Sequence, residues 1–404
     1  MKVAYFVSRF PKITETFVLY EALALLKLGV DVEIFPLVEH REDAAHPEAE
    51  EMESRVTRVS VGVRECWLVA RTALFVSPIK FLRALRSLFR CSGGSPAHII
   101  RALALLVKIV AISDEIKRRG FDHVHAHFAT HPALAACMAR DLTGIPYTFT
   151  AHGSDLHRDP RGLRAKILGS AFAVTISDYN RAFMLEHAGQ ELADRIRVFR
   201  CGADLSKFQG GVHGKDGPFR IACVAALREV KGHRFLLDGL GVLREANIPF
   251  ECCLAGDGPL RRQLEEDVQA RGLGAHVRFL GSQSRDEVAA LLAQSNVIAL
   301  TSIQDRAGRR EGIPVSLMEG MAAGLPAVAS RISGIPELVE DGVSGWLTPP
   351  GDGGAIGEAL LRLARDPGCA RQMGDEGRRR VIASYDLTVN AATFAAALKE
   401  SVGA

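Results

Sequence analysis

Short apolar runs alternate with longer segments of helical periodicity along almost the whole chain. The short runs are rich in β-branched and aromatic residues, as buried strands are. A first group comprises Val3–Val7, Val32–Pro36, His123–His127, Tyr147–Ala151 and Phe172–Ile176, and a second comprises Arg220–Ala225, Phe250–Ala255, Val277–Leu280, Val297–Leu300 and Pro326–Ser330. Strands that alternate with helices form parallel sheets through right-handed crossovers. The pattern therefore predicts two doubly wound α/β domains.

The domain boundary is predicted from composition and length. A chain of 404 residues is long enough for two domains. The stretch 209–217 is rich in glycine and polar residues, as linkers are. We therefore predict an N-terminal domain over residues 1–208 and a C-terminal domain over residues 209–384. A last helix within residues 385–404 is expected to fold back on one domain, and packing on the N-terminal domain is the working prediction.

The composition excludes several classes of protein. Hydrophobic residues make up 48% of the chain and charged residues 24%, which is ordinary for a globular protein and excludes wholesale disorder. The eight cysteines lack C-x-x-C spacing, so a disulfide framework or a zinc site is not expected. The start of the chain lacks the features of a signal peptide, and no apolar run is long enough to span a membrane. We expect a soluble, cytoplasmic protein.

One segment carries the features of an anion site. Pro314 suits the first position of a helix, and Gly324 suits the residue just past its end. The helix then begins directly after Glu311 and Gly312, so its free N–H groups could receive a diphosphate. Glu311 precedes the helix and Glu319 lies inside it, so the two carboxylates could bind different parts of one ligand. The alternative is a surface loop with a capping carboxylate and an exposed helical one.

The same segment carries a family resemblance. Glu311-x7-Glu319 followed by Gly-Met-Ala-Ala-Gly-Leu-Pro326 resembles the signature of the retaining glycosyltransferases of family four, of the exopolysaccharide and colanic-acid type. This family has the GT-B fold, in which two Rossmann-like domains face each other across an interdomain cleft. Further segments match in the same order: Phe10–Phe17, Thr150–Asp155, Val174–Ser177, Cys201–Phe208, Leu254–Pro259, Phe279–Gly281 and Ser333–Glu337. The resemblance covers residues 1–35 and 120–390.

The resemblance implies roles for individual residues. His152 and Glu311 are the implied catalytic residues, because both contact the transferred sugar in the family. Glu319 would bind the ribose of the donor, which is expected to be a UDP- or GDP-sugar. Backbone groups would hold the nucleobase, the sugar and the phosphates; these belong to Leu280, Gly281, Gly312, Ile313, Pro314 and Val315. No cofactor is implied.

The leaving diphosphate requires positive charge. Lys231 matches the family's lysine, but Ala226 stands where an arginine is expected. Arg228, two residues further on, could replace it, since a guanidinium suits phosphate oxygens. The alternative is that Arg228 is a solvated loop residue and Lys231 acts alone. No Asp-x-Asp metal motif is present at the expected place, so we predict a metal-independent enzyme.

Other polar residues are assigned to the acceptor side or to structure. His123, His125 and His127 alternate along one strand and so point to one side. A metal site is one interpretation of this pattern, but a structural or acceptor-side role is favoured and no metal is expected. The predicted acceptor-side residues are Thr14, Glu15, Thr16, His127 and Asp155.

Residues 64–119 form a basic helical insertion. One predicted helix carries an apolar face of Phe81, Leu82, Leu85, Leu88 and Phe89. Such a helix could lie on an anionic membrane at the inner face, or it could pack on its own domain with solvated cations. Nucleic acid is not an expected partner, because aromatic interleaving and known binding motifs are absent from the sequence.

The sequence thus predicts a retaining glycosyltransferase that moves a hexose or related sugar from a nucleotide-diphosphate donor to a glycan or polyprenyl-linked acceptor in polysaccharide biosynthesis. Two alternatives remain open. One is a tailoring glycosyltransferase that acts on a small molecule, and the other is a catalytically silent GT-B binding protein, which the alanine at position 226 suggests.

Overall fold

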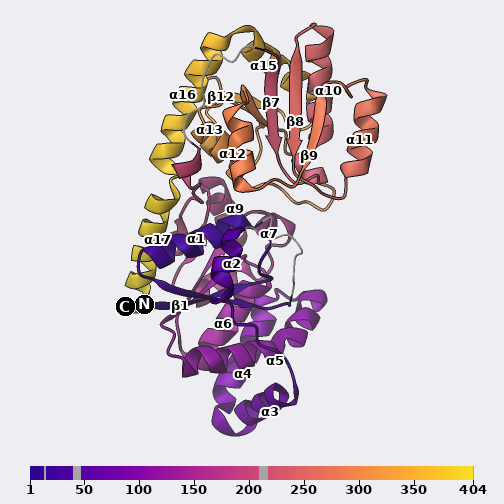
Figure 1. Ribbon diagram of the computed structural model, residues 1–404. Helices are drawn as coiled ribbons and strands as arrows, with labels where there is room; N and C mark the ends of the chain where they lie inside the picture. Colours follow the sequence, from indigo (N-terminus) through magenta and orange to yellow (C-terminus); the bar gives the residue numbers. More distant parts are fainter. Residues whose placement is uncertain (13–14, 40–46, 209–216, 404) are drawn as a thin grey trace. The chain divides into compact units, whose positions relative to one another are not determined.

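The computed structural model describes residues 1–12, 15–39, 47–208 and 217–403, and it divides into two compact units (Figure 1). One unit contains residues 1–199 and 391–404, and the other contains residues 200–390. Each unit holds a six-stranded parallel sheet flanked by helices. The prediction of two doubly wound Rossmann-like domains is therefore confirmed.

The sheet of the first unit has the strand order β2-β1-β3-β4-β5-β6. Its strands are β1 (Lys2–Val7), β2 (Asp31–Pro36), β3 (His123–His127), β4 (Tyr147–Ala151), β5 (Ala173–Thr175) and β6 (Ile196–Val198). The last strand, β6, is only three residues long and was not predicted from the sequence. The order reverses direction between β1 and β3, so the loops that follow these two strands diverge at the carboxyl edge of the sheet.

Two helical layers cover this sheet, and the alternation of side chains along β1 shows why. Ala4 and Phe6 join one buried cluster, while Val3, Tyr5 and Val7 join another on the opposite face. The layer on the first face includes α4 (Pro78–Cys91), α5 (Pro96–Arg118), α6 (His131–Thr143), α8 (Leu163–Gly169) and α9 (Asp178–Ala188), and the layer on the second includes α1 (Thr16–Lys27), α2 (Pro47–Glu53) and α17 (Leu387–Gly403).

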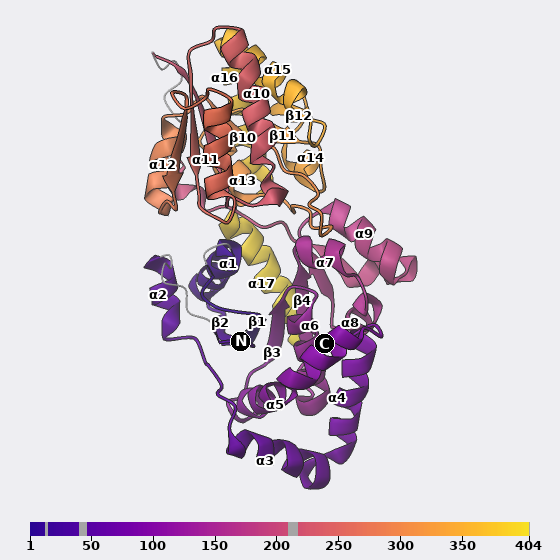
Figure 2. The ribbon, with the colours of Figure 1, turned by 90° about the vertical axis from the view of Figure 1, so that its right-hand side faces the viewer.

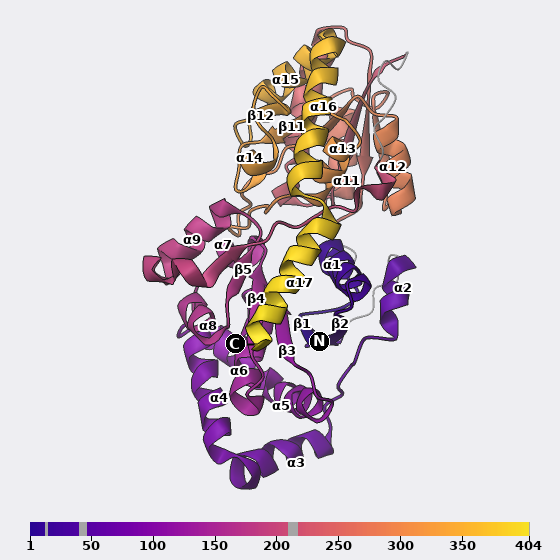
Figure 3. The same cartoon turned by 90° about the vertical axis from the view of Figure 1, so that its left-hand side faces the viewer.

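The C-terminal helix α17 is thus part of the first unit from Ala391 onward. Phe394 and Leu398 are buried with Val3 and Tyr5, and the Phe394 ring lies 5.0 Å from the ring of His125. Figure 3 shows this helix across the face of the sheet that also carries α1. Apolar residues at helical spacing near the end of the chain therefore complete the core of the first sheet.

The remaining elements of the first unit are short or peripheral. They are α3 (Val63–Arg71), the π-helical turn η1 (Thr72–Val76), α7 (Ser154–Arg158) and the 3₁₀ turn η2 (Gln190–Arg195).

All eight cysteines of the chain are free thiols. Among the described helices, none combines the length and the apolar character that crossing a bilayer requires.

The sheet of the second unit has the order β12-β11-β10-β7-β8-β9. Its strands are β7 (Phe219–Val224), β8 (Phe250–Ala255), β9 (Val277–Gly281), β10 (Val297–Leu300), β11 (Ala327–Ser330) and β12 (Gly345–Thr348). The helices and turns are η3 (Leu205–Lys207), η4 (Glu229–Lys231), α10 (His233–Glu245), α11 (Arg261–Ala270), α12 (Arg285–Ala293), α13 (Val315–Ala322), α14 (Ile335–Leu338), α15 (Gly353–Arg365) and α16 (Pro367–Ser384). Here the order reverses between β7 and β10.

Candidate active site

The reversal between β7 and β10 positions the predicted donor-site residues. Ligands of open parallel sheets bind where the strand order reverses, at the carboxyl ends of the strands, because the adjacent loops turn away from each other there. The loop after β7 carries Arg228 and Lys231, and the long loop after β10 carries Glu311. The structure therefore brings residues 80 positions apart in the sequence to one edge of the sheet.

Lys231 and Glu311 meet directly. The Lys231 Nζ lies 2.5 Å from a Glu311 carboxylate oxygen, and the two side chains are only 19% and 18% exposed. A partly buried ion pair of this kind holds both charges at the edge of the sheet without a bound ligand. An anionic group that reached Lys231 would compete with Glu311 for it, and would leave the carboxylate available for hydroxyl donors.

The helix after Glu311 begins close to the ion pair. Helix α13 spans Val315–Ala322, and Pro314 is its N-cap residue, with no side chain capping the first turn. The prediction that Pro314 occupies the first helical position was wrong by one residue: its ψ of 128° is extended, so only its carbonyl takes part in the helix. The Pro314 carbonyl accepts hydrogen bonds from the amides of Leu317 and Met318. The first-turn N–H groups have no acceptor within the helix, which makes this end electropositive.

The loop after β7 is held by the turn after β8. The amide of Leu227 donates to the carbonyl of Asp257 (2.9 Å), and the amide of Leu260 donates back to the carbonyl of Leu227 (3.1 Å). Gly256 has a φ of +140°, and a Cβ there would lie 2.1 Å from the carbonyl oxygen of Ala225. This close approach explains why position 256 is a glycine, and it fixes the backbone of the loop that leads to Lys231.

Arg228 and the end of β9 complete the predicted donor residues. Arg228 is exposed and caps η4, where its carbonyl accepts from the Lys231 amide at 3.0 Å. Gly281 ends β9 with a φ of +72°, and its carbonyl accepts from the Gly256 amide at 2.7 Å. The Leu280 carbonyl accepts from the Gln283 side chain at 2.9 Å. Ile313 is buried and Gly312 half-buried beside α13.

Glu319 has an unusual environment inside α13. Burial raises the pKa of its carboxyl to about 7; nearby Arg285 opposes this shift and Asp204 adds to it. Arg285 itself is held by Asp204, whose carboxylate and backbone carbonyl accept its guanidinium at 2.8 and 2.7 Å. Arg285 lies outside the segments that carry the resemblance. Asp204 lies inside one of them, Cys201–Phe208, but no motif indicated that it would contact Arg285 near Glu319.

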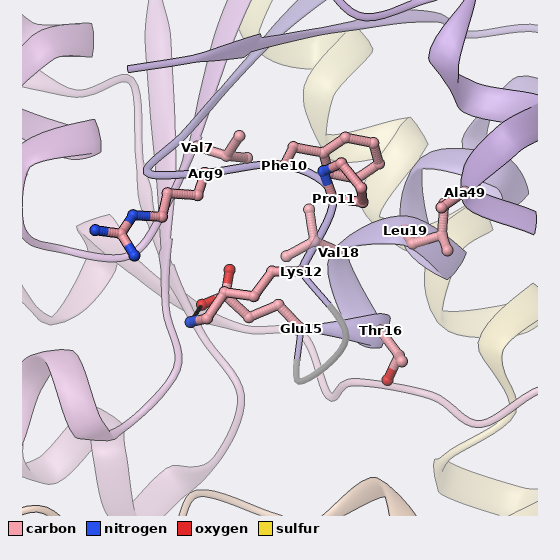
Figure 4. Close-up of a pocket in the computed structure, with 10 residues that line it drawn as sticks. All are labelled: Val7, Arg9, Phe10, Pro11, Lys12, Glu15, Thr16, Val18, Leu19 and Ala49. Atoms are coloured by element: carbon pink, nitrogen blue, oxygen red, sulfur yellow. Dashed lines mark hydrogen bonds and ion pairs between the residues drawn. The ribbon is translucent and has the colours of Figure 1, made fainter. Parts of the chain in front are cut away.

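In the first unit, the loop after β1 leads to a small pocket shown in Figure 4. The Lys12 ammonium forms an ion pair with Glu15, and Thr16 is the first residue of α1. Thr14, the third predicted acceptor-side residue of this loop, lies outside the described residues. The pocket is lined by Val7, Arg9, Phe10, Pro11, Lys12, Glu15, Thr16, Val18, Leu19 and Ala49.

A buried polar chain runs from β1 to the end of β4. The Tyr5 hydroxyl donates to a Glu21 carboxylate oxygen (2.7 Å), and that oxygen lies 3.4 Å from the His127 Nε2. The His127 Nδ1 lies 3.1 Å from the His152 Nε2. The ring of Phe17 packs on His152 with a centroid distance of 4.4 Å. Sequence reasoning missed Glu21, whose position on a half-buried helix gave no motif to find.

Burial keeps the imidazoles of His152 and His123 neutral. It lowers the pKa of His152 well below its usual value, with a smaller contribution from His127, and it lowers the pKa of His123 to about 3. His152 can therefore offer a hydrogen bond to a neutral hydroxyl without carrying a charge.

The alternating histidines have hydrogen-bond partners within the sheet. The His125 Nδ1 and Nε2 lie 2.8 and 3.0 Å from the hydroxyls of Thr148 and Thr150. Within the described ranges, Glu21, His125 and His127 bring ligand atoms within 4.8 Å of one another, close enough for a metal ion. A metal at His125 would break one of its two hydroxyl contacts, so the geometry favours the structural interpretation.

Asp155 fixes the loop that carries His152. Its carboxylate accepts hydrogen bonds from the backbone N–H groups of Ala129 (2.7 Å), His152 (3.0 Å) and Gly153 (2.8 Å). Asp155 is itself buried. A carboxylate with three amide donors joins the loops after β3 and β4, and so sets the direction of the His152 side chain.

Known proteins match the chain along most of its length. The family model "Glycosyltransferase Family 4" matches residues 14–207, and the model "Glycosyl transferases group 1" matches residues 207–380. The amylovoran biosynthesis glycosyltransferase AmsK of Erwinia amylovora is 31% identical over 391 residues, which cover 90% of this chain and 91% of AmsK.

Solved structures share the fold. The Anabaena protein Alr3699/HepE in complex with UDP superimposes with a TM-score of 0.74 at 16% identity, over 99% of this chain and 100% of that chain. Sucrose-phosphate synthase from Thermosynechococcus elongatus gives the same TM-score at 19% identity, over 99% of each chain. The resemblance found in the sequence motifs is thus confirmed, and the chain belongs to the GT-B glycosyltransferases of family four.

Proposed function

We propose that this glycosyltransferase takes a sugar from a nucleotide-diphosphate donor, with retention of configuration, and adds it to a growing glycan in polysaccharide biosynthesis. The observation that carries the proposal is the Lys231–Glu311 ion pair beside the open first turn of α13. It combines a cation for phosphate oxygens, a carboxylate for sugar hydroxyls and a helix N-terminus for an anion. The UDP complex of Alr3699/HepE and the role of AmsK in amylovoran biosynthesis support this choice.

In this proposal the donor diphosphate displaces Glu311 from Lys231. The phosphates would take the Lys231 ammonium and the amides at the start of α13, and the freed Glu311 carboxylate would accept from hydroxyls of the transferred sugar. As the sugar–phosphate bond breaks, negative charge grows on the distal phosphate, where these groups stabilise it most. This arrangement supplies the charge without a metal ion, and Arg228 is an additional cation three residues before Lys231.

The other assignments follow from hydrogen-bonding capacity. Glu319 would accept from the ribose hydroxyls, and the backbone at Leu280 and Gly281 would contact the nucleobase. His152, kept neutral by burial, would bind a hydroxyl of the donor sugar near the reacting carbon. Glu15, Thr16, His127 and Asp155, together with Thr14, are proposed to shape or support the acceptor side.

A cytoplasmic site of action belongs to the same proposal. The eight free thiols suit a reducing compartment, and a polyprenyl-linked glycan at the inner face of a membrane is the proposed acceptor.

Turnover distinguishes this proposal from a silent binding protein. Purified protein is incubated with UDP- and GDP-sugars, and released nucleoside diphosphate is measured without acceptor and with lipid-linked or glycan acceptors. Slow donor hydrolysis or transfer that Glu311→Gln abolishes supports the enzyme. Donor binding without release under every condition supports the silent GT-B protein, and transfer only to small aglycones supports the tailoring alternative.

A further inference from the structure

The basic insertion of the first unit leaves an apolar surface exposed. No residue of α3 is buried, and Val63 and Trp67 are 89% and 64% exposed. The following turn η1 exposes Leu74 to 67% and Phe75 to 81%. Figure 2 shows α3 at the end of this unit, with α4 extending away from it and α5 beside it. Side chains of this size are rarely left together in solvent.

Helix α4 exposes apolar side chains on the side opposite its buried row. It buries Ala84, Leu88 and Cys91, which follow one another at helical spacing and pack in the core. Ile79, Leu82 and Phe89 lie about 180° around the helix from that row, given 100° per residue. These three side chains are 66%, 64% and 52% exposed.

The helix is therefore apolar on two opposite sides. The prediction of one apolar face formed by Phe81, Leu82, Leu85, Leu88 and Phe89 was wrong, because Leu88 packs inward while Leu82 and Phe89 point outward.

A second apolar row runs along α3 into η1. Val63, Trp67, Ala70 and Leu74 are spaced by four, three and four residues, so they lie on one side of the helix. We call the exposed set on α3, η1 and α4 the apolar face; its main members are Val63, Trp67, Leu74, Phe75, Ile79 and Leu82.

Positive charge dominates the segment that carries the apolar face. Between residues 63 and 101 the chain carries a single acidic residue, Glu65, against seven basic ones: Arg64, Arg71, Lys80, Arg83, Arg86, Arg90 and Arg101. Arg86 lies within the outer row of α4, between Leu82 and Phe89, and Arg83 and Arg90 flank it. Among the described residues, no ion pair involves any of the seven basic side chains. Their charge is thus uncompensated by the protein itself.

We propose that the apolar face docks on an anionic lipid bilayer. Aromatic and aliphatic side chains would enter the boundary between headgroups and acyl chains, and the arginines would contact lipid phosphates. A second copy of this chain is a poorer occupant, because pairing the face with itself would bring seven cations against seven. This inference goes beyond sugar transfer and stands on the exposed residues alone; it agrees with a lipid-linked acceptor.

Vesicle binding tests the proposal with the full-length protein. We expect flotation with vesicles of phosphatidylcholine and phosphatidylglycerol, much weaker flotation with phosphatidylcholine alone, and release by high salt. Arg83→Gln/Arg86→Gln should weaken the partition coefficient on anionic vesicles about thirtyfold. Trp67→Ser/Phe75→Ser should weaken it by at least tenfold. Ile382→Ser, at a 49% exposed apolar residue of α16, is the matched control and should leave it unchanged.

Three results would overturn the proposal: no flotation of the wild-type protein, equal binding to neutral vesicles, or full binding by both double variants. Concentration-dependent dimerisation that Trp67→Ser/Phe75→Ser abolishes would make the face a self-interface instead. The same variants are assayed for thermal stabilisation by sugar nucleotides. Loss of vesicle binding with intact donor binding separates this inference from the donor-site proposal.

Discussion

The raised pKa of Glu319 should make the free energy of unfolding depend on pH even without a bound ligand. With a native pKa of about 7 and an ordinary value of 4.5, the native state holds a proton that the unfolded chain releases between these values. The free energy of unfolding therefore falls as the pH rises through this window. Between pH 5 and pH 8 the linkage relation gives a loss of about 2.5 kcal/mol from this one group.

Glu319→Gln removes the ionisation while keeping the shape. We expect the variant to gain about 2.5 kcal/mol in free energy of unfolding relative to the wild type when both are moved from pH 5 to pH 8. Because only the change between pH 5 and pH 8 is compared, any effect of the substitution on packing that does not depend on pH cancels. Urea unfolding in a Trp67→Phe background serves as the assay, because the remaining tryptophan, Trp346, then reports on the second unit.

The same residue links pH to donor affinity. If Glu319 binds ribose as a carboxylate, its ionised fraction rises from about 9% at pH 6 to about 91% at pH 8, so the dissociation constant of a nucleoside diphosphate falls about tenfold. The Glu319→Gln variant should bind the nucleoside diphosphate more weakly and should lose the pH dependence of affinity that comes from Glu319. The pH dependence that comes from titration of the phosphate itself remains in both proteins. A stability difference that is independent of pH, or of opposite sign, would refute the assigned environment.

Three further predictions concern single contacts. Lys231→Met should weaken nucleoside diphosphate binding at least tenfold in calorimetry, whereas Arg262→Met, at an exposed cation of α11, should not. Asp155→Asn should lower the free energy of unfolding of the first unit by about 2 kcal/mol, since an amide NH₂ would face a backbone N–H group; an unchanged urea midpoint would contradict the role given to that carboxylate. Gly374→Ala should lower the melting temperature, because its Cβ would lie 1.9 Å from the Gly324 carbonyl oxygen, whereas Gly241→Ala meets no atom within 4 Å and should not lower it.

The fold could be predicted where strands are long and continuous in their apolar character. Runs such as Val3–Val7 and Phe250–Ala255 predicted their strands because both faces of a parallel sheet are buried. The strands β6 and β12 were missed because each lies at the edge of its sheet, where exposed or half-buried positions interrupt the apolar run. The two-faced helix α4 was misjudged because periodicity gives the apolar positions but not which of them find a partner.

The sequence motifs indicated candidate site residues one by one but not the contacts between them. Motifs indicated Lys231, Glu311 and Glu319 separately. Their environments depend on the strand order, which brings the loops after β7 and β10 together, and on Arg285, which no motif marked. Glu21 likewise belongs to the buried polar chain only because α1 brings it next to His127 at the end of β3.

A thermal-shift panel of sugar nucleotides tests whether Lys231, Glu311 and the start of α13 form a donor site. We predict that at least one UDP- or GDP-sugar stabilises the protein, by about 2.7 kcal/mol at a hundred times its dissociation constant, without added divalent cation. Lys231→Met should lose most of this effect at the same concentration. The absence of any shift with every sugar nucleotide and with free UDP and GDP would contradict the donor site at Lys231, Glu311 and α13.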